Sequence, residues 1–140
     1  MQRKLPEEGK EILIEGWLTY DVTANGVSFT VHSNIPDETP LIFSLRGKHY
    51  FAQSSSVVSN QQATSATFSN KGDSLADGIY ELTITVPCYS VLPESIKNIF
   101  GEGNRNLVGQ NISYNPVLGN TIKFIFHCLV HGVDVEVIKE

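Results

Sequence analysis

Apolar and polar residues alternate along most of this chain, which is the pattern of strands that bury one face of a sheet. The alternation is clearest at the following apolar positions: Ile12, Ile14, Leu18, Tyr20 and Val22; Val27, Phe29 and Val31; Leu41, Phe43 and Leu45; Leu75, Tyr80, Leu82, Ile84 and Val86; Ile122, Phe124, Phe126, Cys128 and Val130; and Val133, Val135 and Val137. Turn residues separate these stretches. We therefore predict eight or nine strands.

The first part of the chain predicts a β-hairpin. The Asn-Gly pair at 25–26 is typical of a two-residue turn between strands. In that register Val22 lies opposite Phe29 and Tyr20 lies opposite Val31. Both strands then place their apolar side chains on one side, so the turn chemistry and the hydrophobic pattern agree.

A second hairpin is expected at Gly47, where a turn leads into apolar positions at Tyr50 and Ala52. The segment 53–67 is rich in Ser, Gln, Thr and Ala, and its polarity favours exposed strands at the edge of a sheet. Residues 71–73 should form a turn before the next strand.

The period of the pattern changes between residues 93 and 100, which indicates one short helix. Four apolar residues there share a helical face: Leu92, Ile96, Ile99 and Phe100. Pro93 suits the first helical position, and Gly101 suits the C-terminal cap.

The chain has 140 residues, of which 41% are hydrophobic, and this is the size of one domain with a continuous core. We expect residues 1–10 to be a polar tether and residues 11–140 to be a single domain. The predicted fold class is all-β: a sandwich of two antiparallel sheets, with one short helix near 93–100.

The formal net charge of -5 argues against a nucleic-acid partner, because the ten basic residues are scattered rather than clustered. The chain has no apolar run long enough for a transmembrane segment. The polar start is compatible with an exported protein whose signal has been removed and equally with a cytoplasmic terminus. Both locations stay open from these residues.

The segment from Leu75 through Asp77, Gly78 and Tyr80 to Leu82 resembles the strand entry of immunoglobulin-like domains. The resemblance implies an immunoglobulin-like sandwich in which Tyr80 is structural and caps a corner through its hydroxyl. We expect a buried Tyr80 whose hydroxyl reaches a backbone group at 71–77. Leu82 stands where that pattern has a cysteine, so the inter-sheet disulfide would be missing.

A wider set of positions resembles uncharacterised modules of bacterial surface lipoproteins and exported proteins. These positions are Gly47, Tyr50, Phe68, Leu75, Gly78, Tyr80, Pro93, Phe100, Gly101, Asn106, Leu107 and Gly109. The resemblance implies an extracellular or cell-envelope location and a binding or spacer role, with no catalytic motif to carry over.

The run from Phe126 to Gly132 resembles the copper-binding end of cupredoxins. The resemblance implies Cys128 and His131 as loop ligands, with His49 or His32 as the distant ligand. The usual axial methionine has no counterpart, because Met1 is the only methionine. We favour the structural interpretation, in which Cys128 lies in the core and the histidines lie at the surface, and we predict no metal and no cofactor.

The remaining chemistry is sparse, and we predict that the chain is not an enzyme. The serines at 54–56 have no Gly-x-Ser-x-Gly context, so they indicate an exposed strand and loop. Trp17 lies off the face set by Ile14, Leu18 and Tyr20, which leaves two interpretations, a core residue on a bent strand or an exposed binding aromatic. We favour the core.

Cys88 and Cys128 both follow apolar positions of predicted strands. If those strands are antiparallel neighbours, Cys88 lies near Asn120 or Thr121, too far from Cys128 for a disulfide. We therefore predict two reduced and mostly buried thiols.

These observations favour a non-catalytic binding or spacer module of the bacterial cell envelope, with a protein or cell-surface ligand as partner. Two alternatives remain. One is a cupredoxin-like copper redox protein that uses Cys128 and His131, and the other is a cytoplasmic structural or assembly protein that uses the sheet edge at 53–67.

Overall fold

The computed structural model describes residues 5–115, 119–132 and 134–138, and within them the protein is all-β with one short α-helix. The eleven strands of the described residues are β1 (Ile12–Leu13), β2 (Gly16–Thr23), β3 (Gly26–Ser33), β4 (Pro40–Gly47), β5 (Tyr50–Val57), β6 (Gln62–Thr64), β7 (Gly78–Thr85), β8 (Leu107–Val108), β9 (Ile112–Ser113), β10 (Thr121–His131) and β11 (Asp134–Ile138). This number exceeds the expected eight or nine. β8 and β9, with two residues each, are too short for an alternating pattern to reveal them.

The largest sheet has the order β11-β10-β7-β4-β5, and β9 pairs with the start of β10. All its pairings are antiparallel. The register places Leu82 of β7 between Leu45 of β4 and Phe126 of β10. β7 and β10 are therefore antiparallel neighbours, as expected for the two strands that carry the apolar positions before Cys88 and Cys128.

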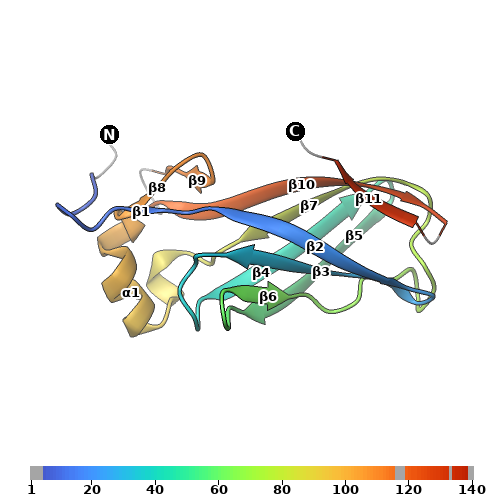
Figure 1. Ribbon diagram of the computed structural model, residues 1–140, viewed down its shortest axis with the longest axis horizontal. Coiled ribbons are helices and arrows are strands. Elements are labelled where there is room, and N and C mark those ends of the chain that lie inside the picture. The colour runs from blue at the N-terminus through green and yellow to red at the C-terminus, as the bar shows by residue number, and fades with distance from the viewer. Residues whose placement is uncertain (1–4, 116–118, 133, 139–140) are drawn as a thin grey trace.

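A three-stranded sheet, β2-β3-β6, lies against the large one, and β1 and β8 form a separate parallel pair (Figure 1). The arrangement thus has three sheets rather than the expected two. The parallel pair joins segments that are far apart in the sequence, which local periodicity does not predict.

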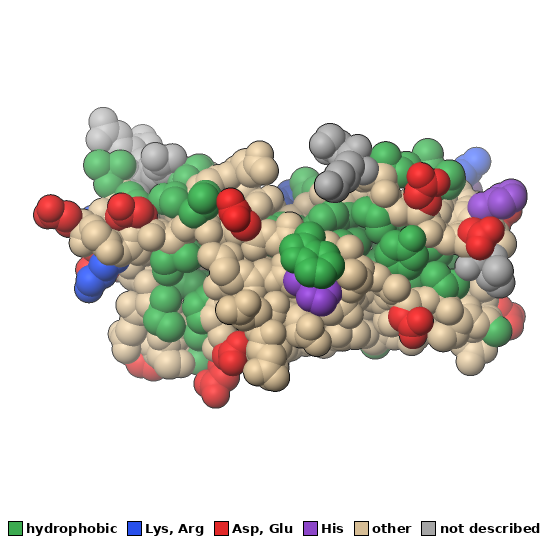
Figure 2. Space-filling view, in the orientation of Figure 1, with side chains coloured by type: hydrophobic (Ala, Val, Ile, Leu, Met, Phe, Trp, Pro, Cys, Tyr) green, Lys and Arg blue, Asp and Glu red, His purple; other side chains and the backbone are tan. Residues whose placement is uncertain are grey.

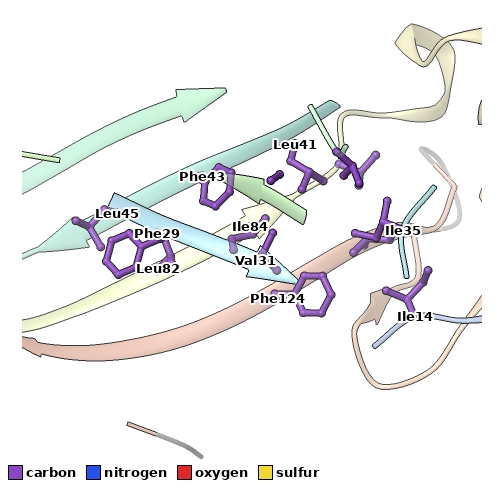
Figure 3. Packing of buried hydrophobic residues seen from close by; sticks show 14 of the residues in the cluster. Ile14, Phe29, Val31, Ile35, Leu41, Phe43, Leu45, Leu82, Ile84 and Phe124 are labelled. Carbon is purple, nitrogen blue, oxygen red and sulfur yellow. The ribbon is translucent and has the colours of Figure 1, made fainter. Parts of the chain in front are cut away.

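The core fills the space between the inner faces of the two main sheets. Figure 3 shows Phe29 and Val31 of β3 pointing toward Leu45, Leu82 and Ile84 of the large sheet. All five side chains are buried. The alternating positions that predicted the strands therefore supply this apolar core.

The first hairpin forms with a register that differs from the expected one. Ala24 and Asn25 make the turn, Val22 lies opposite Val27, and Tyr20 lies opposite Phe29. Gly26 has a positive φ of 134°, and a Cβ there would overlap the backbone oxygen of Phe68. The close approach of Phe68 therefore fixes Gly26 at the first strand position after the turn. A shift of two residues preserves the side of the sheet to which each side chain points.

The second hairpin is confirmed, with β4 and β5 joined at Lys48 and His49. The segment 53–67 also lies where its polarity indicated. It supplies most of β5, at one edge of the large sheet, and all of β6, at the edge of the small sheet. The turn at 71–73 is present, with a bridge between Asn70 and Asp73.

The helix α1 (Glu94–Phe100) matches the predicted segment and ends at Gly101, with two short 3-10 turns, Tyr89–Val91 and Glu102–Asn104, on either side. Ile96 and Phe100 are buried, but Ile99 is 43% exposed, so the apolar face is narrower than predicted. In the described ranges, no helix combines the length and the apolar character needed to cross a membrane.

The described part of the expected tether, residues 5–10, is hydrogen-bonded to the loop after α1. Arg105 Nε donates to the backbone oxygen of Leu5 at 2.7 Å, and the backbone N–H of Glu7 donates to Asn106 Oδ1 at 2.9 Å. Figure 1 shows this segment beside α1, at the end of the molecule opposite the β2–β3 turn.

Candidate functional site

A groove of about 710 Å³ lies where the small sheet meets the β8–β9 connection. Four separate segments line it: the start of β2, the end of β3, the turn before β6 and the turn between β8 and β9. The lining residues are Glu15, Gly16, Trp17, His32, Ser33, Asn34, Asn60, Gln61, Gln110 and Asn111. Almost all of them are polar, so the groove suits a ligand that forms hydrogen bonds.

Trp17 is the most exposed aromatic side chain of the groove, with 59% of its surface accessible. It pairs across the strands with His32, and the two rings stack with their centroids 3.9 Å apart and their planes 9° apart. The prediction that Trp17 belongs to the core is wrong. Because it alternates with Leu18, it points to the outer face of the small sheet, which no further layer of described residues covers.

The imidazole beneath the indole is itself held in place. His32 is half-buried, and its Nε2 lies 2.9 Å from Thr19 Oγ1, on the same face of β2 as Trp17. Figure 2 shows, over β2, a hydrophobic side chain lying on a histidine. The stack therefore presents one face of the indole to solvent on a fixed support.

A second set of polar groups fixes the backbone at the floor of the groove. Asn34 accepts a hydrogen bond from the backbone N–H of Glu15 and donates one to the backbone oxygen of Leu13. Ser33 Oγ donates to the backbone oxygen of Glu15 at 2.7 Å, and Asn111 Nδ2 donates to that of Ile14 at 3.1 Å. These side chains shape the groove, since their hydrogen-bonding atoms are largely engaged.

The rim of the groove carries polar side chains that are free to meet a ligand. Glu15, Asn60, Gln61 and Gln110 are all exposed, and within the described part of the chain their side chains form no hydrogen bond. They line the same groove as Trp17. The sequence pattern does not predict this set, because three of the four residues lie in turns that meet only in the folded protein.

The candidate copper ligands are not brought together. Cys128 and His131 are three residues apart on β10, so they point to opposite faces: the thiol is buried, whereas His131 is exposed beside Asp77 at 3.5 Å. His49 is exposed in the β4–β5 turn, and His32 lies in the groove. In the described ranges, no three His, Cys, Asp or Glu side chains form a group that could hold a metal ion.

The two cysteines are free thiols, as predicted, but only Cys128 is buried. Burial raises the pKa of the Cys128 thiol to about 11, which disfavours the thiolate. Cys88 is exposed, contrary to the prediction, because the chain leaves the sheet at Pro87 and enters the 3-10 turn Tyr89–Val91. The Ser90 hydroxyl lies 3.3 Å from Cys88 Sγ, and this hydrogen bond lowers the pKa of that thiol.

Tyr80 lies where the corner interpretation placed it. Its side chain is 4% exposed, and its hydroxyl donates a hydrogen bond of 2.7 Å to the backbone oxygen of Ala76. The serines at 54–56 lie on the edge strand β5, where Ser54 Oγ accepts a hydrogen bond from the backbone N–H of Ala66.

The groove around Trp17 is thus the site at which an aromatic platform and unpaired polar side chains coincide. Comparison of the chain with models of protein families, with curated proteins and with solved structures gave no match in any of the three.

Proposed function

We propose that this protein is a non-catalytic binding module of the bacterial cell envelope and that the Trp17 groove is its binding site. The single observation that carries the proposal is the exposed Trp17 ring, stacked on His32 above a polar groove. A large exposed aromatic side chain is among the residues that contribute most to binding a partner, because its apolar area is large and rigid.

Binding rather than catalysis fits the chemistry of the groove. The hydroxyl of Ser33 is engaged by the backbone of Glu15 and Ile35, and the His32 ring is held by Trp17 and Thr19. These contacts give both side chains a structural role, which favours binding over nucleophilic or acid–base catalysis. Among the described lining residues Glu15 is the one carboxylate, and a lone exposed carboxylate is a hydrogen-bond acceptor rather than a catalytic pair.

An immunoglobulin-like sandwich is the fold we propose for this module. The buried Tyr80 with its backbone hydrogen bond at the start of β7 supports this assignment, as do the two main sheets that enclose the core. The location at the envelope rests on the resemblance of the sequence to modules of bacterial surface lipoproteins. Fractionation of the source cells, followed by detection of the protein, tests the location directly.

The binding proposal is tested by sedimentation with washed bacterial envelope fragments. We expect the purified protein to sediment with the fragments and Trp17→Ala to remain largely in solution. Phe51→Ala is the matched control, because Phe51 is 56% exposed but lies on β5, outside the groove. Equal sedimentation of both variants, or none of the unmodified protein, would overturn the proposal.

A further inference from the structure

We infer that the Trp17 groove binds the neutral part of a carbohydrate chain, an inference that rests on the proposed binding function. A sugar ring has two kinds of surface: faces of C–H groups, which pack on aromatic rings, and a rim of hydroxyls, each both a donor and an acceptor of hydrogen bonds. The groove presents the complement of each kind.

The indole of Trp17 is the complement of the C–H face. The His32 imidazole covers one side of the indole at 3.9 Å, so the 59% of Trp17 that is exposed includes the opposite side. Thr19 holds His32 and thereby keeps the stack in one orientation. The Trp17 side chain therefore loses little conformational entropy when the C–H face of a sugar ring packs on the indole.

The rim residues are the complement of the hydroxyls. Asn60, Gln61 and Gln110 each bring a carboxamide that both donates and accepts hydrogen bonds, and Glu15 adds two acceptor oxygens. Within the described residues these groups have no partner, so they lose only water when a ligand binds. Sugar hydroxyls also donate and accept hydrogen bonds, so they match these carboxamides better than a ligand group that only donates or only accepts.

The composition of the lining disfavours the other common classes of ligand. Its described residues include no Lys or Arg, which phosphate groups of nucleic acids and lipids require. Among the lining residues that the structure describes, Trp17 is the one large apolar side chain, so a lipid tail would find little surface to cover there. The acidic side chains on this face are dispersed rather than gathered in a patch (Figure 2).

The outer face of the small sheet extends the site beyond one sugar ring. Next to the Trp17–His32 row, the register aligns Thr19, Thr30 and Thr64 across all three strands. Thr30 and Thr64 share a hydrogen bond of 2.8 Å and Thr19 bonds His32, and each hydroxyl keeps capacity for a further hydrogen bond. The row lies two residues along the strands from Trp17, or about 7 Å. A chain of several sugars that stacks on Trp17 would reach it, so oligosaccharides should bind more tightly than the corresponding single sugar.

Titration with defined oligosaccharides tests the inference. The probes are tetramers of β-1,4-linked N-acetylglucosamine, β-1,4-linked glucose, α-1,4-linked glucose and mannose, with hexaproline as a peptide control. Trp17 is the only tryptophan of the chain, so a change in its emission reports binding at the groove itself. We expect a saturable change with at least one tetramer, a weaker one with its monomer and none with hexaproline.

Calorimetric titration with the tetramer that binds then compares the variants. Trp17→Ala should weaken binding by about tenfold or more, the usual effect of removing a central aromatic anchor. Gln61→Ala and Gln110→Ala should each weaken it by about fivefold, the effect of one hydrogen bond. Phe51→Ala should bind as the unmodified protein does. If no tetramer binds, or if Trp17→Ala binds equally well, the inference is wrong.

Competition and protease treatment separate this inference from the proposed function. An excess of the tetramer that binds competes with the sugars of the envelope fragments, and a broad protease removes proteins from them. We expect the tetramer to abolish sedimentation of the protein and the protease to leave it unchanged. The opposite result would leave a binding module whose ligand is a protein and would overturn the carbohydrate inference alone. No sedimentation with untreated fragments would overturn both.

Discussion

Tyr80 packs against the backbone of Gly47 so closely that a Cβ on Gly47 would lie 2.6 Å from two carbons of the tyrosine ring. The two residues belong to the neighbouring strands β7 and β4, and the Tyr50 ring meets the Tyr80 ring edge-on at 5.7 Å. The glycine is therefore needed at this position for space, because its own backbone is not in the left-handed region. This contact explains why an otherwise regular strand ends in a residue without a side chain.

Replacement of Gly47 by alanine should destabilise the protein by about 1 to 3 kcal/mol, because the added methyl group forces the Tyr80 ring to move within a packed core. Urea denaturation measures the change in the free energy of unfolding. In a Tyr80→Leu background the same replacement should cost clearly less, since the smaller side chain leaves room. Equal costs in the two backgrounds would contradict the proposed clash.

Tyr80→Phe should lower the free energy of unfolding by about 1 kcal/mol or slightly more, because the backbone oxygen of Ala76 loses its 2.7 Å hydrogen bond while the ring stays packed. Tyr20→Phe is the control, since the Tyr20 hydroxyl is exposed and forms no hydrogen bond within the described residues. Urea denaturation measures the free energy of unfolding of both variants. A comparable decrease in both would show that the Tyr80 hydrogen bond does not stabilise the protein as predicted.

The two thiols should differ sharply in reactivity. Iodoacetamide should modify Cys88 rapidly in the folded protein and Cys128 only after unfolding, because Cys88 is exposed and Cys128 is buried. The rate of Cys88 modification should begin to rise at a lower pH than that of an ordinary thiol, since the Ser90 hydrogen bond lowers the pKa of Cys88. Ser90→Ala should shift this rise to higher pH. Mass spectrometry of the two peptides gives both rates.

Burial of Cys128 predicts a loss of stability in alkaline solution. Its pKa is raised from 9.0 to about 11 in the folded state, so the folded protein holds this proton more tightly than the unfolded chain does. The contribution is therefore fully present below about pH 9 and is lost as the pH rises to about 11, with a total of about 2 to 3 kcal/mol. Cys128→Ala should lack this part of the pH dependence. Urea denaturation at several pH values measures the free energy of unfolding of both proteins. If it falls equally with pH in both, the assignment to Cys128 is wrong.

Alternation of apolar residues predicted the parts of the fold that depend on it. The faces of β3, β4, β7 and β10 are as predicted, because a strand whose apolar side chains all lie on one side has a single favourable orientation over a core. The polarity of segment 53–67 correctly predicted strands at sheet edges, because an edge strand is more exposed to solvent. In the first hairpin the faces were correct while the register was wrong, since a shift of two residues leaves every face unchanged.

The features that were missed depend on contacts between distant segments. The parallel pairing of Ile12 with Leu107 has no local signature, and the four segments of the groove meet only in the folded chain. Cys88 was misplaced because the alternation was extended past Pro87, where the chain leaves the sheet. For Trp17 a signal was present, since its neighbours Gly16 and Leu18 belong to the opposite face of the strand.

The exposed Trp17 ring makes a prediction that needs no ligand. Because Trp17 is the only tryptophan, its emission should lie close to that of an indole in water, and acrylamide should quench it almost as well as in the unfolded chain. His32→Ala should raise the quenching further, since the imidazole at 3.9 Å shields one side of the ring, while the free energy of unfolding should fall by about 1 kcal/mol. Thr19→Val, which removes the hydrogen bond to His32 but keeps the imidazole, should give an intermediate value. A short-wavelength emission resistant to acrylamide would place Trp17 in a covered position and would remove the platform on which the binding proposal rests.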